Sequence, residues 1–114
     1  HIMENILFCE LLSRGYQVDV GHVETWRVNT DGSKKRVPLE VDFVLNKGAE
    51  RIYIQSAFSM PDQDKLNQEL RPLTTIHDSF RKIIVTQDNI PAWTNEDGIQ
   101  IINLFDFLLQ EAPL

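Results

Sequence analysis

The chain has 114 residues, of which 11 are basic and 17 acidic, and its formal net charge at pH 7 is -6. This length suits one compact domain, and the acidic balance repels phosphate backbones over the surface as a whole, which argues against a stand-alone nucleic-acid-binding protein. Because the sequence has neither an apolar run long enough to span a bilayer nor a signal peptide pattern, we expect a cytoplasmic protein without a membrane partner.

The first predicted element is a helix that ends before Gly15. Apolar residues recur at helical spacing within ENILFCELLSRGY. The predicted apolar stripe consists of Leu7, Phe8, Leu11 and Leu12. The single cysteine, Cys9, excludes an internal disulfide and is expected to be buried in this helix.

The start of the sequence indicates a domain taken from a longer protein. Residues 1–3, His1-Ile2-Met3, are typical of a cloning vector, which leaves a single domain at residues 4–114. Residue 4 already lies inside the helical pattern, so we expect that this domain was cut from a larger chain.

Strands and a hairpin are predicted next. Alternating apolar and polar residues predict a strand from residue 16 to 28, with Gly21 as a bulge within it. Asp31-Gly32 indicates a hairpin turn. The one basic cluster, Lys34-Lys35-Arg36, is interpreted as a solvated turn, although a local basic patch remains an alternative.

Two further strands are predicted at residues 39–45 and 51–58, joined by a four-residue loop at residues 47–50. This loop places Asn46 opposite Arg51, and counting outward places Asp42 opposite Gln55. One face of the strand pair is then continuously apolar and consists of Leu39, Val41, Phe43, Leu45, Ile52 and Ile54. The other face is partly polar and consists of Glu40, Asp42, Val44, Tyr53, Gln55 and Ala57.

Helix and strand alternate in the second half of the chain. Ser59 is predicted to cap a helix that Pro72 kinks or ends. A run rich in β-branched residues at 82–86 predicts a buried strand. In the loop at residues 87–98, Trp93 is interpreted as a plug over the core.

A last strand at residues 99–102 leads into a helix that Asn103 can cap. The predicted apolar stripe of this helix consists of Leu104, Phe105, Leu108 and Leu109. Helix–strand alternation after a three-stranded meander predicts an α/β fold with a mixed sheet and helices on both faces.

Polar residues within the apolar strands are the candidate site. Opposed residues on neighbouring strands have Cβ atoms about 5 Å apart, so Asp42 and Gln55 could share a hydrogen bond or a hard cation. Glu4 lies on the inward face of the first helix, which we expect to pack over the same face of the sheet. The predicted cluster is therefore Glu4, Asp42 and Gln55, with Tyr53 nearby.

The order of these features resembles the PD-(D/E)XK nuclease superfamily, in which an early helical Glu precedes a strand with Asp and a strand with Glu-x-Lys. Glu4, Asp42 and Gln55 occupy the corresponding positions. More closely, nearly the whole chain resembles the C-terminal domain, of unknown function, of prokaryotic AAA-type ATPases. The matching stretches are ENILFCELLSRGYQVDVG, LEVDFV, YIQSAF, LRPL and IINLFDFLL.

The resemblance implies a restriction-endonuclease-like three-layer fold. Its αβββαβ core would contain a mixed sheet of four or five strands, followed by an extra strand and a C-terminal helix. It also implies an N-terminal ATPase module as partner. ATP would bind only to that module, since this chain has no GxxxxGK[ST] loop.

The chain departs from the superfamily at its catalytic motif. Members cut DNA with magnesium held by the acidic residues, while the lysine positions or activates water. Here Gln55-Ser56-Ala57 replaces Glu-x-Lys. Magnesium needs anionic oxygen ligands, so Asp42 and Glu4 alone would hold Mg²⁺ or Mn²⁺ weakly. Lys82, on the next strand, could in principle reach the site from another direction.

The sequence therefore predicts a non-catalytic, nuclease-like domain that interacts with DNA, with protein or with another protomer. Glu4, Asp42 and Gln55 would be vestigial. The alternatives are an active Mg²⁺- or Mn²⁺-dependent nuclease with an altered site, and a purely structural oligomerisation module.

Each candidate residue also has a structural explanation. Asp42 and Gln55 could be hydrogen-bonded strand residues, and Glu4 could lie in a frayed terminus. Glu40 is most simply an exposed carboxylate. The resemblance implies that Gln68 and Arg71 lie where some related nucleases touch substrate, and the surface of an amphipathic helix explains them equally well.

Overall fold

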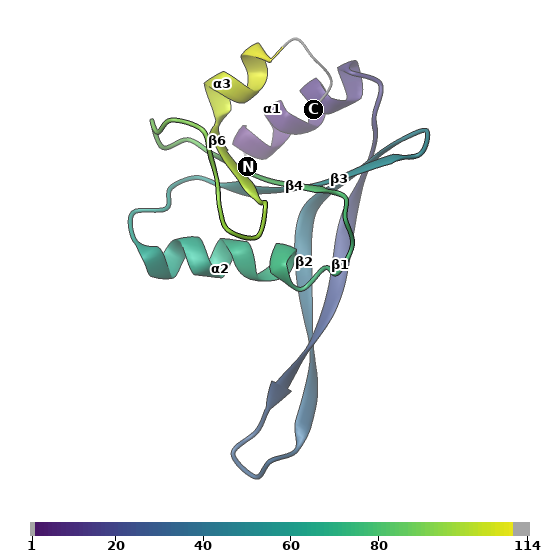
Figure 1. The fold of residues 1–114 in the computed structure, drawn as a ribbon. Helices are drawn as coiled ribbons and strands as arrows, with labels where there is room; N and C mark the ends of the chain where they lie inside the picture. Colours follow the sequence, from purple (N-terminus) through teal and green to yellow (C-terminus); the bar gives the residue numbers. More distant parts are fainter. Residues whose placement is uncertain (1, 111–114) are drawn as a thin grey trace.

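The computed structural model describes residues 2–110, apart from the side chains of Val23 and Thr25. It is a mixed α/β fold with helices on both faces of one sheet (Figure 1). His1, the first of the three residues typical of a vector, lies outside the described residues. In chain order the elements are α1 (Ile2–Ser13), β1 (Gln17–Val28), β2 (Lys34–Lys47), β3 (Glu50–Ala57), α2 (Gln63–Thr74), β4 (Arg81–Thr86), β5 (Trp93–Thr94), β6 (Gln100–Asn103) and α3 (Leu104–Leu109).

The sheet has six strands in the order β1-β2-β3-β4-β6-β5. The meander β1-β2-β3 is antiparallel, and α2 then carries the chain across to β4, which lies parallel to β3. β6 continues the parallel part, and β5 returns antiparallel along its edge. The prediction of four or five strands was wrong because the two-residue strand β5 lies in the segment predicted to be a loop. A strand that short has no periodicity to recognise.

Two apolar cores lie on opposite faces of the sheet. α1 and α3 cover one face, and α2 covers the other (Figure 1). The first core includes Leu7, Leu11, Phe43, Leu45, Ile52, Ile54 and Phe107. The second core includes Val41, Tyr53, Ala57, Leu73, Ile84 and Ile101. Burial on both faces explains why β3 and β4 are almost continuously apolar.

The predicted register of β2 and β3 is confirmed. Asn46 pairs with Arg51, and Leu45 with Ile52. The loop is shorter than predicted, because Lys47 and Glu50 also pair and leave only Gly48 and Ala49 between the strands. Shortening the loop by one residue at each end leaves the register unchanged.

An irregularity in the pairing of β1 with β2 lies next to Gly21, but the extra residue belongs to β2 rather than to the predicted bulge at Gly21. The pairing changes from Asp19 with Val44 to Gly21 with Val41, so three steps on β2 correspond to two steps on β1. A Cβ at residue 21 would lie 2.5 Å from Cγ2 of Val44 and 3.2 Å from Cβ of Val41. The extra residue of β2 brings Val41 to the α2 face, so its predicted place beside Phe43 was wrong.

The β1–β2 hairpin extends far beyond the rest of the sheet (Figure 1). β3 pairs with β2 only from Phe43 to Lys47, so the outer part is a two-stranded ribbon. We call residues 22–40 the arm and its outer portion, residues 26–37, the arm tip. The predicted Asp31-Gly32 turn closes it, with Gly32 at φ 85°, and the molecule measures 51 Å along its longest axis.

Of the two predicted helix N-caps, the one of α3 is confirmed and the one of α2 was wrong. Asn103 caps α3 as predicted and accepts the N–H of Asp106. Asp62, rather than Ser59, caps α2 and accepts the N–H of Lys65. Pro61 explains the shift, because a helix seldom includes the residue before a proline. Pro72 lies inside α2, which ends two residues later at Thr74.

The buried faces of α1 and α3 are narrower than predicted. Leu7 and Leu11 are buried, but Phe8 and Leu12 are exposed. In α3 the buried residues are Leu104 and Phe107, whereas Phe105 and Leu109 are exposed. Cys9 is exposed, so the prediction of a buried thiol was wrong. Along the described chain, no helix combines the length and apolar character needed to cross a membrane.

Candidate functional site

The candidate site lies where β2 and β3 separate. Their backbone pairing runs as far as Phe43 and Ile54. Beyond that pair, side chains form the bonds between the strands. The N–H of Asp42 donates to Oε1 of Gln55 at 3.0 Å, and the N–H of Ser56 donates to Oδ2 of Asp42 at 2.8 Å. We call this point the fork.

Ser56 connects Asp42 to the first helix. Its hydroxyl lies 2.8 Å from Oδ2 of Asp42 and 3.5 Å from Oε1 of Glu4. A serine hydroxyl carries one proton to donate, and the shorter contact to Asp42 is the better hydrogen bond. Glu4 is therefore an exposed carboxylate at the edge of the fork, held only weakly by Ser56.

Gln55 points to the opposite side of the sheet. Its Nε2 donates to Oε2 of Glu69 on α2 at 3.3 Å, and Glu69 also forms an ion pair with Lys65 at 3.1 Å. The prediction that Gln55 faces the first helix was wrong. Side chains alternate along a strand, and Tyr53 and Ala57 face α2, so Gln55 must face α2 too.

The fork offers a poor set of ligands for a metal ion. Asp42 already accepts two hydrogen bonds on the same oxygen, and Gln55 is neutral and bound to Glu69. Within residues 2–110, no group of three or more His, Cys, Asp and Glu side chains could hold a metal ion. Magnesium is usually bound through several anionic oxygens, and the fork does not fit it.

A shallow hollow of about 470 Å³ opens beside the fork on the α1 side. Its polar lining consists of Glu4, Ser56 and Gln87, and the remaining lining residues are Ile2, Met3 and Phe58. A carboxylate and a hydroxyl at the rim of an apolar hollow can accept or donate hydrogen bonds. The lining residues include no lysine or arginine to stabilise a phosphate transition state.

Lys82 does not reach the fork. Its ammonium group lies 3.0 Å from each of three acceptors, the carboxylate and carbonyl oxygens of Asp78 and the carbonyl oxygen of Phe80. These acceptors match the three protons of an ammonium group. Tyr53, predicted to lie near the site, belongs to this cluster, because its hydroxyl donates to Asp78 at 2.6 Å.

Within the Tyr53–Asp78–Lys82 cluster, the pKa of Tyr53 is raised and the pKa of Asp78 is lowered. Burial, together with the hydrogen bond to Asp78, raises the pKa of Tyr53 above 10.0. Burial also acts to raise the pKa of Asp78, but the hydrogen bonds from Tyr53 and Lys82 outweigh it and hold that pKa below 3.8. The cluster therefore keeps Asp78 charged and Tyr53 neutral at pH 7.

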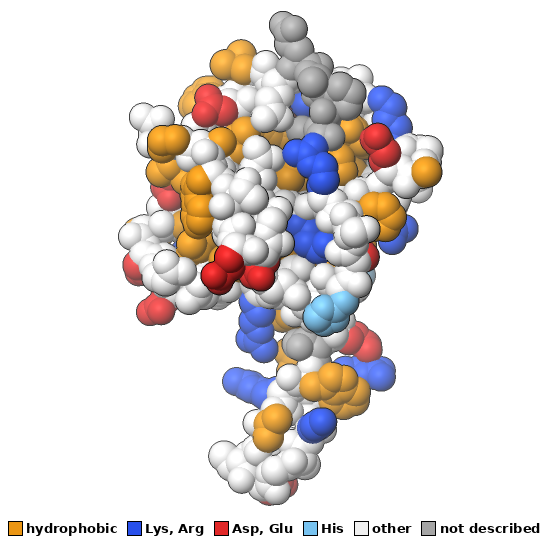
Figure 2. Space-filling model, viewed as in Figure 1, with side chains coloured by type: hydrophobic (Ala, Val, Ile, Leu, Met, Phe, Trp, Pro, Cys, Tyr) orange, Lys and Arg blue, Asp and Glu red, His pale blue; other side chains and the backbone are white. Residues whose placement is uncertain are grey.

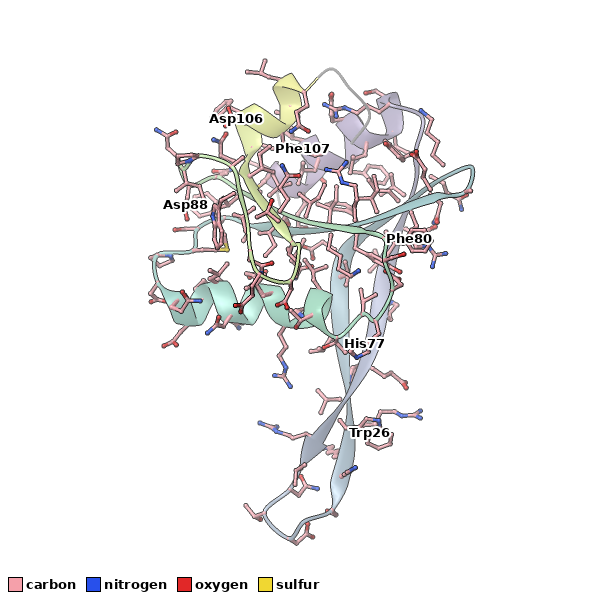
Figure 3. All side chains as sticks on the ribbon, viewed as in Figure 1. Trp26, His77, Phe80, Asp88, Asp106 and Phe107 are labelled. Atoms are coloured by element: carbon pink, nitrogen blue, oxygen red, sulfur yellow. The ribbon has the colours of Figure 1, made fainter. Side chains whose placement is uncertain are left out.

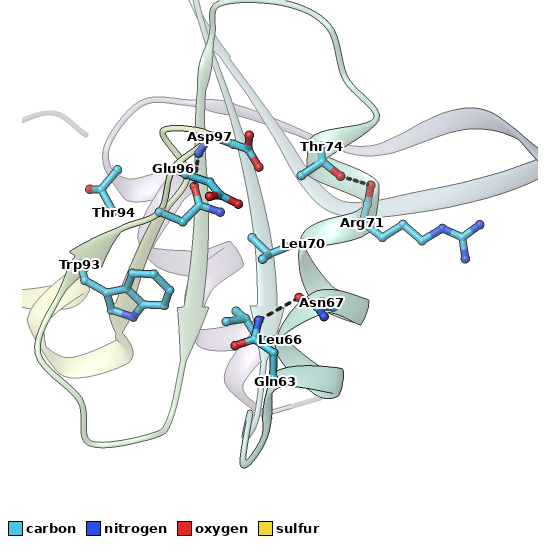
Figure 4. Close-up of a pocket in the computed structure, with 11 residues that line it drawn as sticks. Gln63, Leu66, Asn67, Leu70, Arg71, Thr74, Trp93, Thr94, Glu96 and Asp97 are labelled. Atoms are coloured by element: carbon cyan, nitrogen blue, oxygen red, sulfur yellow. Dashed lines mark hydrogen bonds between the residues drawn. The ribbon is translucent and has the colours of Figure 1, made fainter.

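A groove of about 620 Å³ separates α2 from the loop around β5 (Figure 4). Arg71 lines it, whereas Gln68 lies on the exposed surface of α2 and is absent from the lining. Trp93 also lines this groove and is 43% exposed, so its prediction as a plug over the core was wrong. The lining residues of this groove provide amide, hydroxyl and carboxylate groups beside the apolar side chains of Leu66 and Leu70, and they include no cysteine or histidine.

The sequence alone did not point to Ser56 or Glu69 as part of the site. Ser56 was visible as the polar residue at the end of an otherwise apolar face of β3. Glu69 had no comparable signal, since it lies 14 residues from Gln55 and on a helix whose orientation the sequence did not specify. Glu40, by contrast, is exposed on the arm, as expected for a solvated carboxylate.

Comparison with known proteins identifies a homologous segment but assigns no activity. No family model matches the chain. A Haemophilus influenzae strain Rd protein, described as uncharacterized, is 37% identical to it over 108 residues. That alignment covers 95% of this chain and 23% of the relative. The chain thus spans about a quarter of the length of that relative.

Proposed function

We propose that the chain is a non-catalytic, nuclease-like domain that mediates interaction with DNA or protein on behalf of a larger ATP-binding protein. The observation that carries this proposal is the bonding of Asp42. Its Oδ2 accepts both the N–H and the hydroxyl of Ser56 at 2.8 Å. This oxygen joins two diverging strands, and its use in two hydrogen bonds leaves only Oδ1 of Asp42 as a full ligand for a metal ion.

Three further observations support a non-catalytic site. Gln55 is neutral and is bound to Glu69, and Lys82 is fully occupied by Asp78 and Phe80. Ala57, where a nuclease of this superfamily would carry its lysine, is buried in the α2 core. A lysine at this position would meet apolar side chains rather than a substrate phosphate.

The restriction-endonuclease-like fold is part of the same proposal. The order α1-β1-β2-β3-α2-β4, an antiparallel meander and a parallel β4 support it, as do α1 and α2 on opposite faces. The resemblance to C-terminal domains of prokaryotic AAA-type ATPases supplies the rest. The length of the Haemophilus influenzae relative leaves room for an ATPase module in a protein of that kind.

A cleavage assay tests the absence of catalysis. The chain is incubated with supercoiled plasmid and with single-stranded DNA in the presence of Mg²⁺ or Mn²⁺, and nicked, linear and short products are resolved on gels. We expect no product above that formed by buffer alone. The matched variant is Asp42→Asn, which removes the negative charge and keeps an oxygen that can accept the N–H of Ser56.

Cleavage by the wild-type chain that disappears in Asp42→Asn would overturn the proposal and establish the active nuclease instead. Cleavage that persists in Asp42→Asn would point to a contaminating nuclease and leave the prediction for the purified chain standing. The oligomerisation alternative predicts a stable dimer or larger assembly, which light scattering detects independently of DNA.

A further inference from the structure

We propose that the arm is a DNA-docking element whose tip inserts into a groove of duplex DNA. This inference rests on the proposed function, because it chooses DNA as the partner and names the surface that binds it. The strongest evidence is the uneven distribution of charge along the molecule.

The arm tip is basic although the chain is acidic. Residues 26–37 contain four of the 11 basic residues and one of the 17 acidic residues, which gives the tip a net charge of +3 and the rest of the chain -9. The tip stands at the far end of the longest axis, away from the helices and the main part of the sheet (Figure 2). DNA can therefore approach the cations with little repulsion from the acidic body.

Two of the cations face each other across the ribbon. Arg27 pairs directly with Lys35 in the β1–β2 register. Like charges in directly opposed positions destabilise a strand pair, and within the described part of the chain neither residue forms an ion pair. Such an arrangement weakens the free ribbon, and a phosphate placed between the two cations would remove the repulsion.

The opposite face of the ribbon carries more cations and an exposed aromatic ring. Arg36 pairs with Trp26, and Lys34 with Val28. Trp26 lies on the protruding ribbon (Figure 3) and is 59% exposed, with the guanidinium of Arg36 at 5.4 Å from its ring centroid. An exposed indole and an exposed valine at the end of a long ribbon do not contribute to either core of the domain.

Cations on both faces favour duplex DNA over a single strand. The major groove of B-DNA is about 12 Å wide and admits a two-stranded β-ribbon. A ribbon inserted there meets phosphates on both sides, so Arg27 and Lys35 can approach one backbone. Lys34 can approach the other backbone together with Arg36, which exchanges its exposed ion pair with Glu24, 3.1 Å long, for a phosphate. A single strand has only one backbone and would leave one pair of cations unused.

Fluorescence anisotropy with a labelled 20-base-pair duplex, and separately with one of its strands, tests the inference. We expect the chain to bind the duplex more tightly than the strand. Four phosphate contacts predict that raising the salt concentration from 50 to 200 mM weakens duplex binding by about 100-fold. Binding should also change the fluorescence of Trp26, and this change should persist in Trp93→Phe.

The decisive variant is Arg27→Gln combined with Lys35→Gln. It should lower duplex affinity by at least about tenfold at 50 mM salt and reduce the slope of log affinity against log salt by about 2. The matched control is Lys47→Gln combined with Arg81→Gln, which likewise removes one lysine and one arginine from exposed positions on the body and should leave affinity nearly unchanged. Circular dichroism establishes that both variants are folded.

Equal weakening by the two double variants would overturn the inference, and so would tighter binding of the single strand or no duplex binding at 50 mM salt. None of these results touches the proposal that the site is non-catalytic, which fails only through metal-dependent cleavage. Conversely, DNA cleavage that is abolished by Asp42→Asn would refute the proposal of a non-catalytic site. That outcome does not depend on which residues bind DNA.

Discussion

At the scale of single residues, the amide of Gln55 is adapted to its neighbour on α2. It is 9% exposed and donates to Glu69 at 3.3 Å, while its oxygen accepts the N–H of Asp42. A neutral side chain with both a donor and an acceptor satisfies both partners. The glutamate found at this position in the nuclease superfamily would instead face the carboxylate of Glu69.

We therefore predict that Gln55→Glu lowers the free energy of unfolding by about 1–3 kcal/mol, because a hydrogen bond becomes a repulsion between two shielded carboxylates. The measurement is urea denaturation followed by circular dichroism at pH 7. Adding Glu69→Gln to this variant should recover most of the lost stability, because the amide of residue 69 can then donate a hydrogen bond to the carboxylate of residue 55. If the double variant is no more stable than Gln55→Glu alone, the contact is not the cause.

The Tyr53–Asp78 hydrogen bond predicts a stability profile that declines at both pH extremes. The pKa of Asp78 is lowered, so its contribution is present above the ordinary carboxyl pKa of 3.8 and is lost as pH falls through the lowered value. The pKa of Tyr53 is raised, so its contribution is present below 10.0 and is lost as pH rises through the raised value.

Urea denaturation between about pH 2.5 and 11 should show this profile. Asp78→Asn should make the acid decline less steep, and Tyr53→Phe should make the alkaline decline less steep. Glu50→Gln, at the exposed first residue of β3, serves as the control and should leave both declines unchanged. An unaltered alkaline decline in Tyr53→Phe would contradict the role given to this hydrogen bond.

At the scale of elements, the course of the β1–β2 hairpin depends on Gly21. The irregularity there lets Val41 and Val44 share the α2 face, although they are three residues apart. The side chains of Val41 and Val44 fill the space that the Cβ of any other residue at position 21 would occupy. Close packing of side chains against a backbone is the reason for glycine here, because its φ is not in the left-handed region.

Gly21→Ala should therefore destabilise the domain by about 1–3 kcal/mol, as expected for a methyl group forced into a filled space. The cost is measured as the change in the denaturation midpoint at constant m-value. Adding Val44→Ala should recover part of the loss, because it removes the methyl group that clashes at 2.5 Å. Additive destabilisation by the two changes would show that this clash is unimportant.

At the scale of the whole molecule, one sheet separates two cores that have to form together. Strands β3 and β4 contribute alternate side chains to each core, as with Ile83 in the first and Ile84 in the second. Arg14 joins α1 to α3, since its guanidinium donates to the carbonyl oxygens of Phe107 and Leu108 and lies over the Phe107 ring. Loss of either helical layer would expose one face of the same strands.

We predict that Leu11→Ala and Leu73→Ala, one in each core, both destabilise the entire domain by about 2–5 kcal/mol. Each residue is completely buried. Unfolding followed by circular dichroism and by Trp93 fluorescence in a Trp26→Phe background should give coincident transitions. Leu109→Ala, at an exposed position of α3, is the control and should change stability by less than about 0.5 kcal/mol. Separate transitions would show that the cores unfold independently.

Local sequence patterns determined the elements and the register of the central strands. Alternation of apolar residues in β2 and β3 allows only a register that keeps Phe43 and Leu45 with Ile52 and Ile54. Capping by Asn103 and the turn at Asp31-Gly32 also depend on groups a few residues apart. For the same reason, the replacement of Glu-x-Lys by Gln55-Ser56-Ala57 was evident from the sequence.

Only the tertiary structure decided which helix covers which face, and with it the character of the candidate site. Periodicity shows that Gln55 and Tyr53 share a face, but it cannot show that α2 rather than α1 packs there. That choice depends on the burial of all apolar faces at once, and it pairs Gln55 with Glu69 and leaves Glu4 with Ser56. The same packing leaves the outer part of the hairpin uncovered by β3 and α2. The basic cluster Lys34-Lys35-Arg36, expected to be a solvated turn, therefore lies in strand β2 on a projecting arm.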